Sequence, residues 1–255
     1  CEVSVIGLIG SDPEGKILAD QLDRRNIVCT NLVESDQRPT TVKSRIMAQN
    51  QQVVRADREV NIDLSETSNK ALAESVNSSL DKMDAIVLED YNKGVLNSIS
   101  IESLIQMAND RKIPIYVDPK KSNFKAYKNV RLFKPNLVEF RNAFDEQDAL
   151  EVAGFNLKNE LNAEILMITR GADGVSLFAG SDYHHIPTKA RHVHDVSGAG
   201  DTVIATFTLA DLCGASPEES VALSNYAAGR VCEEAGVVPI TLTMLNEMVE
   251  HHNSI

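Results

Sequence analysis

The segment SGAGD, residues 197–201, places three small residues and a carboxylate at the start of an apolar helical pattern. A helix that begins near Ala199 leaves the backbone N–H groups of Gly198, Ala199 and Gly200 without acceptors inside the helix. These groups and the positive end of the helix dipole favour a bound anion. Asp201 could accept a proton beside that anion, or it could merely stabilise the helix dipole. The spacing alone favours neither function.

Two other catalytic patterns fail on their chemistry. Residues 10–17, GSDPEGKI, have the spacing of a phosphate-binding P-loop, but Ile17 stands where that motif needs Ser or Thr. Pro13 has no N–H to offer, and the carboxylates of Asp12 and Glu14 would repel a phosphate. The segment DVSGAG lacks the first glycine of a G-x-S-x-G nucleophile elbow. We therefore expect a structural strand-to-helix turn at residues 10–17 and no serine hydrolase.

The charge balance limits the kinds of ligand. The chain has 255 residues, with 25 Lys and Arg against 37 Asp and Glu, a net charge of −12. This charge disfavours a nucleic-acid or membrane-surface binder, so local positive groups or a metal must hold any anion. No apolar run reaches the ~20 residues of a membrane span, and no signal peptide is visible. The four cysteines form no C-x-x-C pair, which indicates reduced thiols in a cytoplasmic protein.

Short apolar runs alternate with amphipathic helical patterns along most of the chain. This alternation predicts βαβ units and a parallel sheet with helices on both faces, an α/β fold. The expected strands are residues 3–10, 84–91, 113–119, 130–135 and 163–171, and the expected helices are 14–26, 100–112, 136–144, 198–214 and 216–236. In such a sheet, ligands bind at the carboxyl ends of the strands. The loops that contain GSDPEG, EDYNKG, DPKKSN, KPNLVE, TRGADG and DVSGAGD are therefore the candidate ligand rim.

Residues 38–60 differ from this pattern. The segments TTVKSRIMA and QQVVRADRE alternate polar and apolar residues, which predicts a two-stranded antiparallel ribbon. The ribbon could be a lid or a subunit contact, and an edge hairpin of the main sheet is equally compatible with the pattern. We expect residues 1–255 to form one α/β domain with this ribbon as a small appendage.

Four motifs in order resemble those of the ribokinase-like (PfkB) carbohydrate kinases. The segment DVSGAGDTVIATF resembles the family signature, which implies that Asp201 is the general base and that the amides of Gly198, Ala199 and Gly200 form the anion hole. The segments KPNLVEF, TRGADG and ALSNYAAG resemble the nucleotide-binding motifs. They imply that Asn136 and Glu139 lie near the phosphates and Mg²⁺, that Thr169, Gly171 and Gly174 line the nucleotide, and that Asn225 approaches the adenine.

Within the family, the segments EDYNKGVL and VDPKKSNFKAYKNVRLFKPNLVEF resemble the subgroup that phosphorylates heptose 7-phosphate at its anomeric hydroxyl. That reaction belongs to the synthesis of the lipopolysaccharide core. Lys93 and Lys120 stand in the strand-end loops and are the candidate ligands of the sugar phosphate. The alternative for each lysine is a solvated surface charge.

The resemblance implies a three-layer sandwich with a mainly parallel central sheet and a small β-ribbon lid. It also implies ATP and Mg²⁺, with Glu139 holding the metal through water, room for a monovalent cation, and a homodimer formed through the lid. The chain starts after the family's first strand and its Gly-Gly-x-x-x-Asn sugar-binding segment, so we expect this N-terminal portion of the fold to be missing. Subgroup members with two domains continue into a nucleotidyltransferase, which we do not expect within these residues. Two alternatives remain: a kinase of another sugar or a nucleoside, and a non-catalytic nucleotide-binding remnant.

Overall fold

The chain divides into two units, which are described one at a time. Unit 1 comprises Cys1–Lys82 and Asn92–Met107, and unit 2 comprises Met83–Tyr91 and Ala108–Ile255. The computed structural model describes residues 1–48, 51–143, 149–188 and 195–252. Within these ranges, every helix falls short of the length and hydrophobicity that a membrane span requires.

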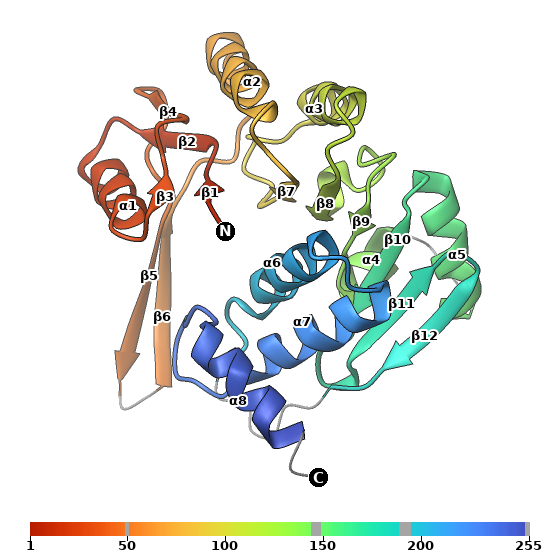
Figure 1. Cartoon of the computed structure of the whole chain (residues 1–255). Helices are drawn as coiled ribbons and strands as arrows, with labels where there is room; N and C mark the ends of the chain where they lie inside the picture. The colour runs from red at the N-terminus through yellow and green to blue at the C-terminus, as the bar shows by residue number, and fades with distance from the viewer. Residues whose placement is uncertain (49–50, 144–148, 189–194, 253–255) are drawn as a thin grey trace. The chain divides into compact units, whose positions relative to one another are not determined.

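Unit 2 is built on a six-stranded sheet in the order β12-β11-β10-β9-β8-β7 (Figure 1). Four neighbouring strands run parallel: β7 (Ile86–Glu89), β8 (Ile115–Asp118), β9 (Leu132–Phe133) and β10 (Ile165–Thr169). The mainly parallel sheet predicted from the sequence is therefore confirmed. The antiparallel strands β11 (Val175–Ala179) and β12 (Asp182–Ile186) were not predicted. Their connections are too short for the crossover that a parallel strand needs.

Helices cover both faces of this sheet. On one face, α6 (Ala199–Leu212) packs on β7 and β8, and α7 (Pro217–Cys232) packs on α6, β11 and β12. Buried residues of α6 and of alternate sheet positions form one cluster there, including Ile165, Met167, Val203 and Phe207. The helix α5 (Leu150–Leu161) packs on β10 and β11, with α4 (Leu137–Ala143) on β10. The central strands β8 to β11 are buried on both faces, and these layers give the expected three-layer sandwich.

Local sequence sets the ends of the helices that frame the sheet. Ser216 caps α7, accepting from Glu219 N, while the Glu219 carboxylate accepts from Ser216 N. This reciprocal pair and a proline in the first turn fix the helix start. In α5, Gly154 lies directly against the Phe178 ring. A Cβ atom at this position would lie only 2.2 Å from the ring, so a larger residue would clash with it. Glycine thus allows α5 to approach β11 closely. The C-terminal helix α8 (Leu242–His252) packs on α7.

Unit 1 contains short parallel strand pairs instead of one continuous sheet. The predicted strand 3–10 was wrong in extent, because it is two strands, β1 (Val3–Ser4) and β2 (Gly7–Gly10). The chain changes pairing partner between them: β1 pairs with β3 (Ile27–Val28), and β2 pairs with β4 (Leu32–Ser35). The unit also holds α1 (Pro13–Asp23) and α2 (Glu66–Leu80), and α3 (Ser98–Asp110) begins in it and ends in unit 2.

The turn at residues 10–17 is structural, as expected. Asp12 caps α1, and its carboxylate accepts from Gly15 N (2.9 Å), Thr40 N (2.9 Å) and Thr40 Oγ1 (2.7 Å). The hydrogen bond from the Thr40 hydroxyl is the main cause of the lowered pKa of Asp12. The protein's own donors therefore occupy this carboxylate, and the turn presents negative charge where a P-loop would bind phosphate.

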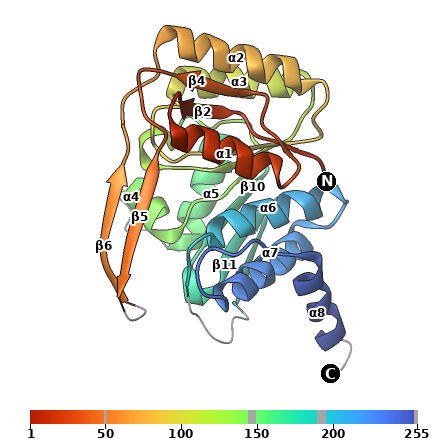
Figure 2. The same cartoon turned by 90° about the vertical axis from the view of Figure 1, so that its left-hand side faces the viewer.

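The predicted ribbon is present in unit 1. The strands β5 (Val42–Ala48) and β6 (Gln51–Arg58) pair antiparallel, with a register shift between Ile46 and Met47. Figure 2 shows the two strands running side by side away from α1 and α2 of the same unit. Ile46, Val53 and Val54 are exposed on it. The ribbon pairs with no other strand of the described chain, so it is not an edge hairpin of the main sheet.

Candidate active site

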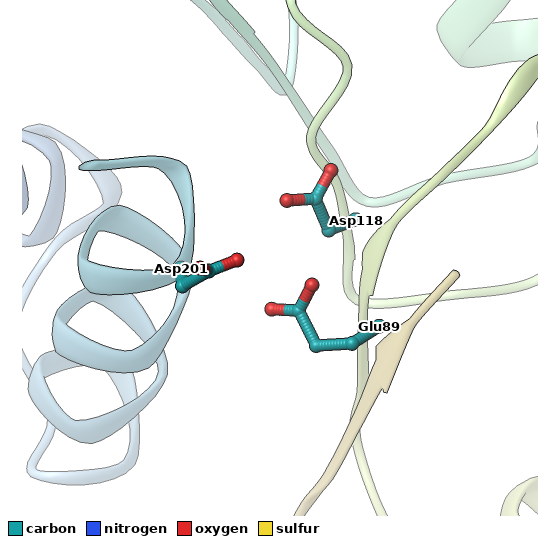
Figure 3. A group of neighbouring side chains, drawn as sticks. All are labelled: Glu89, Asp118 and Asp201. Carbon is teal, nitrogen blue, oxygen red and sulfur yellow. The ribbon is translucent and has the colours of Figure 1, made fainter. Parts of the chain in front are cut away.

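Three carboxylates come together in unit 2, at the carboxyl ends of neighbouring strands. Glu89 ends β7 and Asp118 ends β8, and the two are directly paired in the parallel register. Asp201 faces them from the first turn of α6 (Figure 3). One oxygen of each carboxylate lies within 4.8 Å of the others. The strand-end rule therefore located the site, although sequence analysis named only Asp201 of the three.

Glu89 bears the electrostatic cost of this arrangement. Burial and the negative charges of Asp118 and Asp201 raise the pKa of Glu89 from 4.5 to about 7, and nearby lysines offset only part of the effect. A divalent cation would remove this repulsion, and carboxylate oxygens are the ligands that Mg²⁺ prefers. The three-carboxylate cluster thus fits a hard divalent cation.

The backbone at the start of α6 has the form that the SGAGD segment predicts, with one difference. Gly198 has φ +80°, a left-handed conformation that favours glycine, and α6 begins at Ala199. The amide of Ala199 donates to Val196 O (3.2 Å), because the left-handed turn at Gly198 brings these groups together. Among the described residues, the amides of Gly198 and Gly200 have no acceptor. These two amides, and not all three, are therefore available to an anion.

Asp201 lies at the exposed end of this turn. Tyr91, which follows β7, lies with its hydroxyl 3.5 Å from Asp201 Oδ1. Burial, and then the charge of Asp201, raise the pKa of the Tyr91 hydroxyl, so it stays protonated and is the donor toward the Asp201 carboxylate. The arrangement leaves the carboxylate of Asp201 accessible for a proton from a ligand hydroxyl.

Two lysines flank Asp118. The ammonium of Lys134, which directly follows β9, lies 2.9 Å from Asp118 Oδ2, and that of Lys120 lies 4.0 Å from Asp118 Oδ1. Lys134 is only 2% exposed. Burial lowers the pKa of Lys120, but its hydrogen bond to Glu139 and the charges of Asp118 and Glu139 outweigh this effect and raise it. Lys120 is therefore cationic at neutral pH.

Asn136 and Glu139 are brought together as a cap at the start of α4. Glu139 N donates to Asn136 Oδ1 (2.8 Å), and Asn136 N donates to Glu139 Oε2 (2.9 Å). The other oxygen, Glu139 Oε1, pairs with the ammonium of Lys120. Protein donors thus reach both oxygens of Glu139, which makes the Glu89, Asp118 and Asp201 cluster the better fit for direct metal ligation.

The remaining predicted nucleotide residues follow the same sheet edge. Thr169 ends β10, and Asn136 pairs with it in an isolated parallel bridge. Gly171 and Gly174 bound the short 3₁₀ turn after β10, both with positive φ. At Gly174 a Cβ atom would lie 2.1 Å from Ile186 O, so only glycine fits. Asn225 of α7 donates to Pro187 O (2.9 Å), which holds the segment that follows β12.

Lys93 belongs to unit 1. Its ammonium lies 2.6 Å from Glu59 Oε1, and its backbone carbonyl accepts from Arg38 Nη2 (2.7 Å). The same guanidinium nitrogen donates to Val60 O (2.7 Å), so the buried Arg38 ties the EDYNKG loop to the end of the ribbon. The structure therefore gives Lys93 a fixed position and an ion-pair partner.

The sequence analysis did not name Glu89, Tyr91, Asp118 and Lys134. Glu89, Asp118 and Lys134 share one signal: each is a charged residue at, or directly after, the end of an apolar strand. The strand-end rule selected their loops, but sequence alone does not show which side chains of a loop turn toward a common point.

Sequence comparison assigns the chain to a family. The profile of the pfkB family carbohydrate kinases matches residues 1–243, almost the whole chain and both units. The chain belongs to the PfkB family of carbohydrate kinases. This membership confirms the predicted family and enzyme class.

Similar curated proteins support the same family. The chain is 34% identical over 257 residues to the bifunctional protein HldE of Syntrophotalea carbinolica, which covers 99% of this chain and 52% of that protein. It is 38% identical over 243 residues to HldE of Caulobacter sp., with 93% of this chain and 49% of that protein covered. The chain thus spans about half the length of these PfkB relatives.

Solved structures confirm the ribokinase-like fold. Phosphofructokinase-2 from Escherichia coli in complex with potassium aligns with a TM-score of 0.82 at 18% identity, covering 99% of this chain and 82% of that one. Arabidopsis thaliana ribokinase complexed with ribose and ATP aligns with a TM-score of 0.73 at 18% identity, covering 96% and 82%. At this identity the likeness concerns the PfkB fold.

Proposed function

We propose that this PfkB protein catalyses the ATP-dependent phosphorylation of heptose 7-phosphate at its anomeric hydroxyl. The observation that carries the proposal is the position of Asp201 beside the free amides of Gly198 and Gly200 at the start of α6. Similarity to HldE proteins over more than nine-tenths of the chain, and the heptose-kinase-like segments EDYNKGVL and VDPKKSN, support the choice of sugar.

Asp201 accepts the proton of the attacking hydroxyl, and the oxygen bonds to the γ-phosphorus of ATP as the bond to ADP breaks. The amides of Gly198 and Gly200 and the α6 dipole stabilise the transferred phosphoryl group. Phosphoryl transfer depends chiefly on such positioning and charge stabilisation. The packing of α6 on β7 and β8 holds these groups in place, because all of them belong to the start of that helix.

The nucleotide occupies the rim beside β9 and β10. Asn136, Thr169, Gly171, Gly174 and Asn225 are the proposed nucleotide residues. Mg²⁺ neutralises the phosphate charge when bound. Glu89 and Asp118 would hold the metal directly, and Glu139 would hold it through water. A monovalent cation belongs to the same proposal and would be tested by replacing potassium with a bulky organic cation.

The sugar phosphate needs a cation of its own because the whole chain carries a net charge of −12. Lys120 and Lys93 are the proposed ligands, and each must exchange its carboxylate partner, Glu139 or Glu59, for the phosphate. We also propose that residues 1–255 act as one kinase domain, since the family profile spans both units.

The ribbon supports a proposed homodimer. Ile46 and Val54 face each other across the strands and are exposed, as is Val53. Covering such apolar groups with the ribbon of a second copy would remove them from water. Sedimentation of the wild type against Ile46→Lys/Val54→Lys tests this: the double variant should sediment as a monomer, and an unchanged distribution contradicts the ribbon dimer.

A coupled assay of ADP release, run with a panel of sugars, tests the catalytic proposal. We expect the highest kcat/KM with heptose 7-phosphate, and phosphorus NMR of the product should show a new phosphate on the anomeric carbon. A higher kcat/KM with fructose 6-phosphate, ribose or a nucleoside would assign another PfkB reaction. ATP binding by calorimetry without turnover on any substrate would indicate a non-catalytic nucleotide-binding protein.

A further inference from the structure

Lys134 is a buried lysine at the carboxyl-end edge of the sheet in unit 2. It directly follows β9, and its backbone N–H donates to Val117 O (2.9 Å) of the neighbouring strand β8. The side chain is 3% exposed, and its ammonium lies 2.9 Å from Asp118 Oδ2. Burying an ammonium is costly even when it is paired, so a site that keeps one has a use for its charge or for its carboxylate partner.

The ammonium of Lys134 also borders the first turn of α6. A Cβ atom added at Gly200 would lie 3.6 Å from Lys134 Nζ and 3.7 Å from Asp118 Oδ2. Because Gly200 has no side chain, the Lys134 ammonium can approach the backbone at the start of α6. The Gly200 amide is one of the two that lack an acceptor among the described residues. A fixed positive charge and a free N–H group thus stand side by side.

The carboxylates around this point disfavour a phosphoryl group unless positive charges offset them. Glu89, Asp118 and Asp201 lie together beside the first turn of α6, and their carboxylates repel an incoming phosphoryl group. The helix start supplies only about half a positive charge. Within the described residues, Asp118 is the one carboxylate paired with Lys134, whereas Lys120 also pairs with Glu139. An ammonium has three N–H donors, so pairing with Asp118 does not exhaust it.

We propose that Lys134 is a catalytic residue that binds the phosphoryl group during its transfer, together with the amides of Gly198 and Gly200. The inference rests on the proposed kinase function. The proton of the acceptor hydroxyl goes to Asp201, the new O–P bond forms, the bond to ADP breaks, and Lys134 keeps its own protons throughout. Asp118 holds the ammonium in position before ATP arrives, so its orientation costs nothing during the reaction.

The test compares Lys134→Met, which removes the charge, with Lys134→Arg, which keeps it, in the full chain. Lys125→Met is the matched control, because Lys125 pairs with Glu160 in a largely exposed ion pair that includes none of the three carboxylates. We expect Lys134→Met to lower kcat by about 10²–10³-fold, the range for the loss of one transition-state donor. Its Kd for ADP should stay within about threefold of wild type, Lys134→Arg should recover part of kcat, and Lys125→Met should resemble the wild type.

Other outcomes distinguish a failure of the Lys134 proposal from a failure of the proposed kinase function. A wild type without turnover on any sugar contradicts the proposed kinase. An active wild type with Lys134→Met within about threefold in kcat contradicts the Lys134 proposal alone, as does a lowered melting temperature with normal turnover. If Lys134→Met does not fold, Lys134→Gln, which can still donate to Asp118, replaces it. Aluminium fluoride should then tighten ADP binding in the wild type and not in Lys134→Gln, and equal tightening in both would overturn the proposal.

Discussion

The ammonium of Lys120 pairs with the carboxylate of Glu139, which joins the loop after β8 to the first turn of α4. The sequence analysis predicts different ligands for these two residues: the sugar phosphate for Lys120, and the Mg²⁺ that accompanies the nucleotide for Glu139. Their contact places the two proposed ligand positions next to each other. Steady-state kinetics of variants can show which substrate, the sugar phosphate or ATP, binds to Lys120 in place of Glu139.

Lys120→Ala is expected to raise the KM for heptose 7-phosphate about tenfold or more, since a lost charged hydrogen bond costs about 1.5–3 kcal/mol. The KM for ATP should change much less. Glu139→Gln is the companion variant and should mainly alter the dependence on Mg²⁺ and ATP. Initial rates over a grid of both substrates measure these effects. Equal changes in the two KM values for Lys120→Ala would assign Lys120 to the nucleotide.

Asp201→Asn keeps the shape of the α6 start and removes the proton acceptor. General-base assistance contributes about 10²–10⁴-fold, so kcat should fall by that factor while the protein folds and binds ADP normally. A residue that only stabilised the helix dipole would instead cost ~1 kcal/mol or less of stability and leave turnover intact. Turnover within about tenfold of wild type, measured beside a thermal melt, would exclude Asp201 as the base.

Gly198→Ala tests the left-handed turn before α6. An alanine at φ +80° is strained by roughly 1–2 kcal/mol, and relief of that strain would move the free amides. Gly180→Ala is the control, because Gly180 also has positive φ, at +57°, with open space around it, and it stands in the β11–β12 turn. Both variants should lose similar stability in urea melts, but only Gly198→Ala should lose kcat. Equal activities would show that the turn geometry is not needed for catalysis.

Glu89 makes the stability of the metal-free protein depend on pH. Its pKa is about 7 in the folded chain against 4.5 ordinarily, so between these values the folded state holds a proton that the unfolded state has lost. Stability therefore falls as pH rises from about 4.5 to 7, by roughly 3 kcal/mol, and then levels off. Urea melts of wild type and Glu89→Gln in EDTA, at pH 5 and pH 8, isolate this effect. If the difference in unfolding free energy between wild type and Glu89→Gln were the same at both pH values, Glu89 would not be the cause of the pH dependence.

Asp211 anchors the far end of α6. It accepts from Tyr116 Oη (2.6 Å) and from Arg131 Nε (3.0 Å) and Nη2 (2.7 Å), and its side chain is only 7% exposed. Asp211→Ala leaves a partly buried guanidinium and a phenol without their acceptor, so we expect a loss of about 2–4 kcal/mol in unfolding free energy. Glu164→Ala removes the other acidic partner of Arg131. The Glu164 side chain is 65% exposed, so this substitution should cost less than about 1 kcal/mol of unfolding free energy. Equal losses of unfolding free energy in the two variants would mean that burial does not determine how strongly Arg131 and its partners stabilise the fold.

Patterns with a short range along the chain predicted much of the fold. The helix at Ala199–Leu212 follows from glycines and an aspartate before an apolar run, and the ribbon at 42–58 follows from alternation, because each signal lies within one segment. The start of α7 likewise follows from Ser216 and Pro217, which act on the first turn alone. The division of residues 3–10 between two strands could not be predicted, because it depends on pairing with segments some twenty-five residues away.

The sequence by itself determined that a carboxylate stands in the first turn of a helix that small residues precede, since Gly198, Gly200 and Asp201 are neighbours in the chain. Only the tertiary structure decided what surrounds that turn. Glu89 and Asp118 end two strands and Lys134 directly follows a third, and they meet because parallel strands end at one edge of the sheet while α6 packs across it. Their charges act on one another only at these distances, which is why the raised pKa of Glu89 and the buried ion pair of Lys134 belong to the fold.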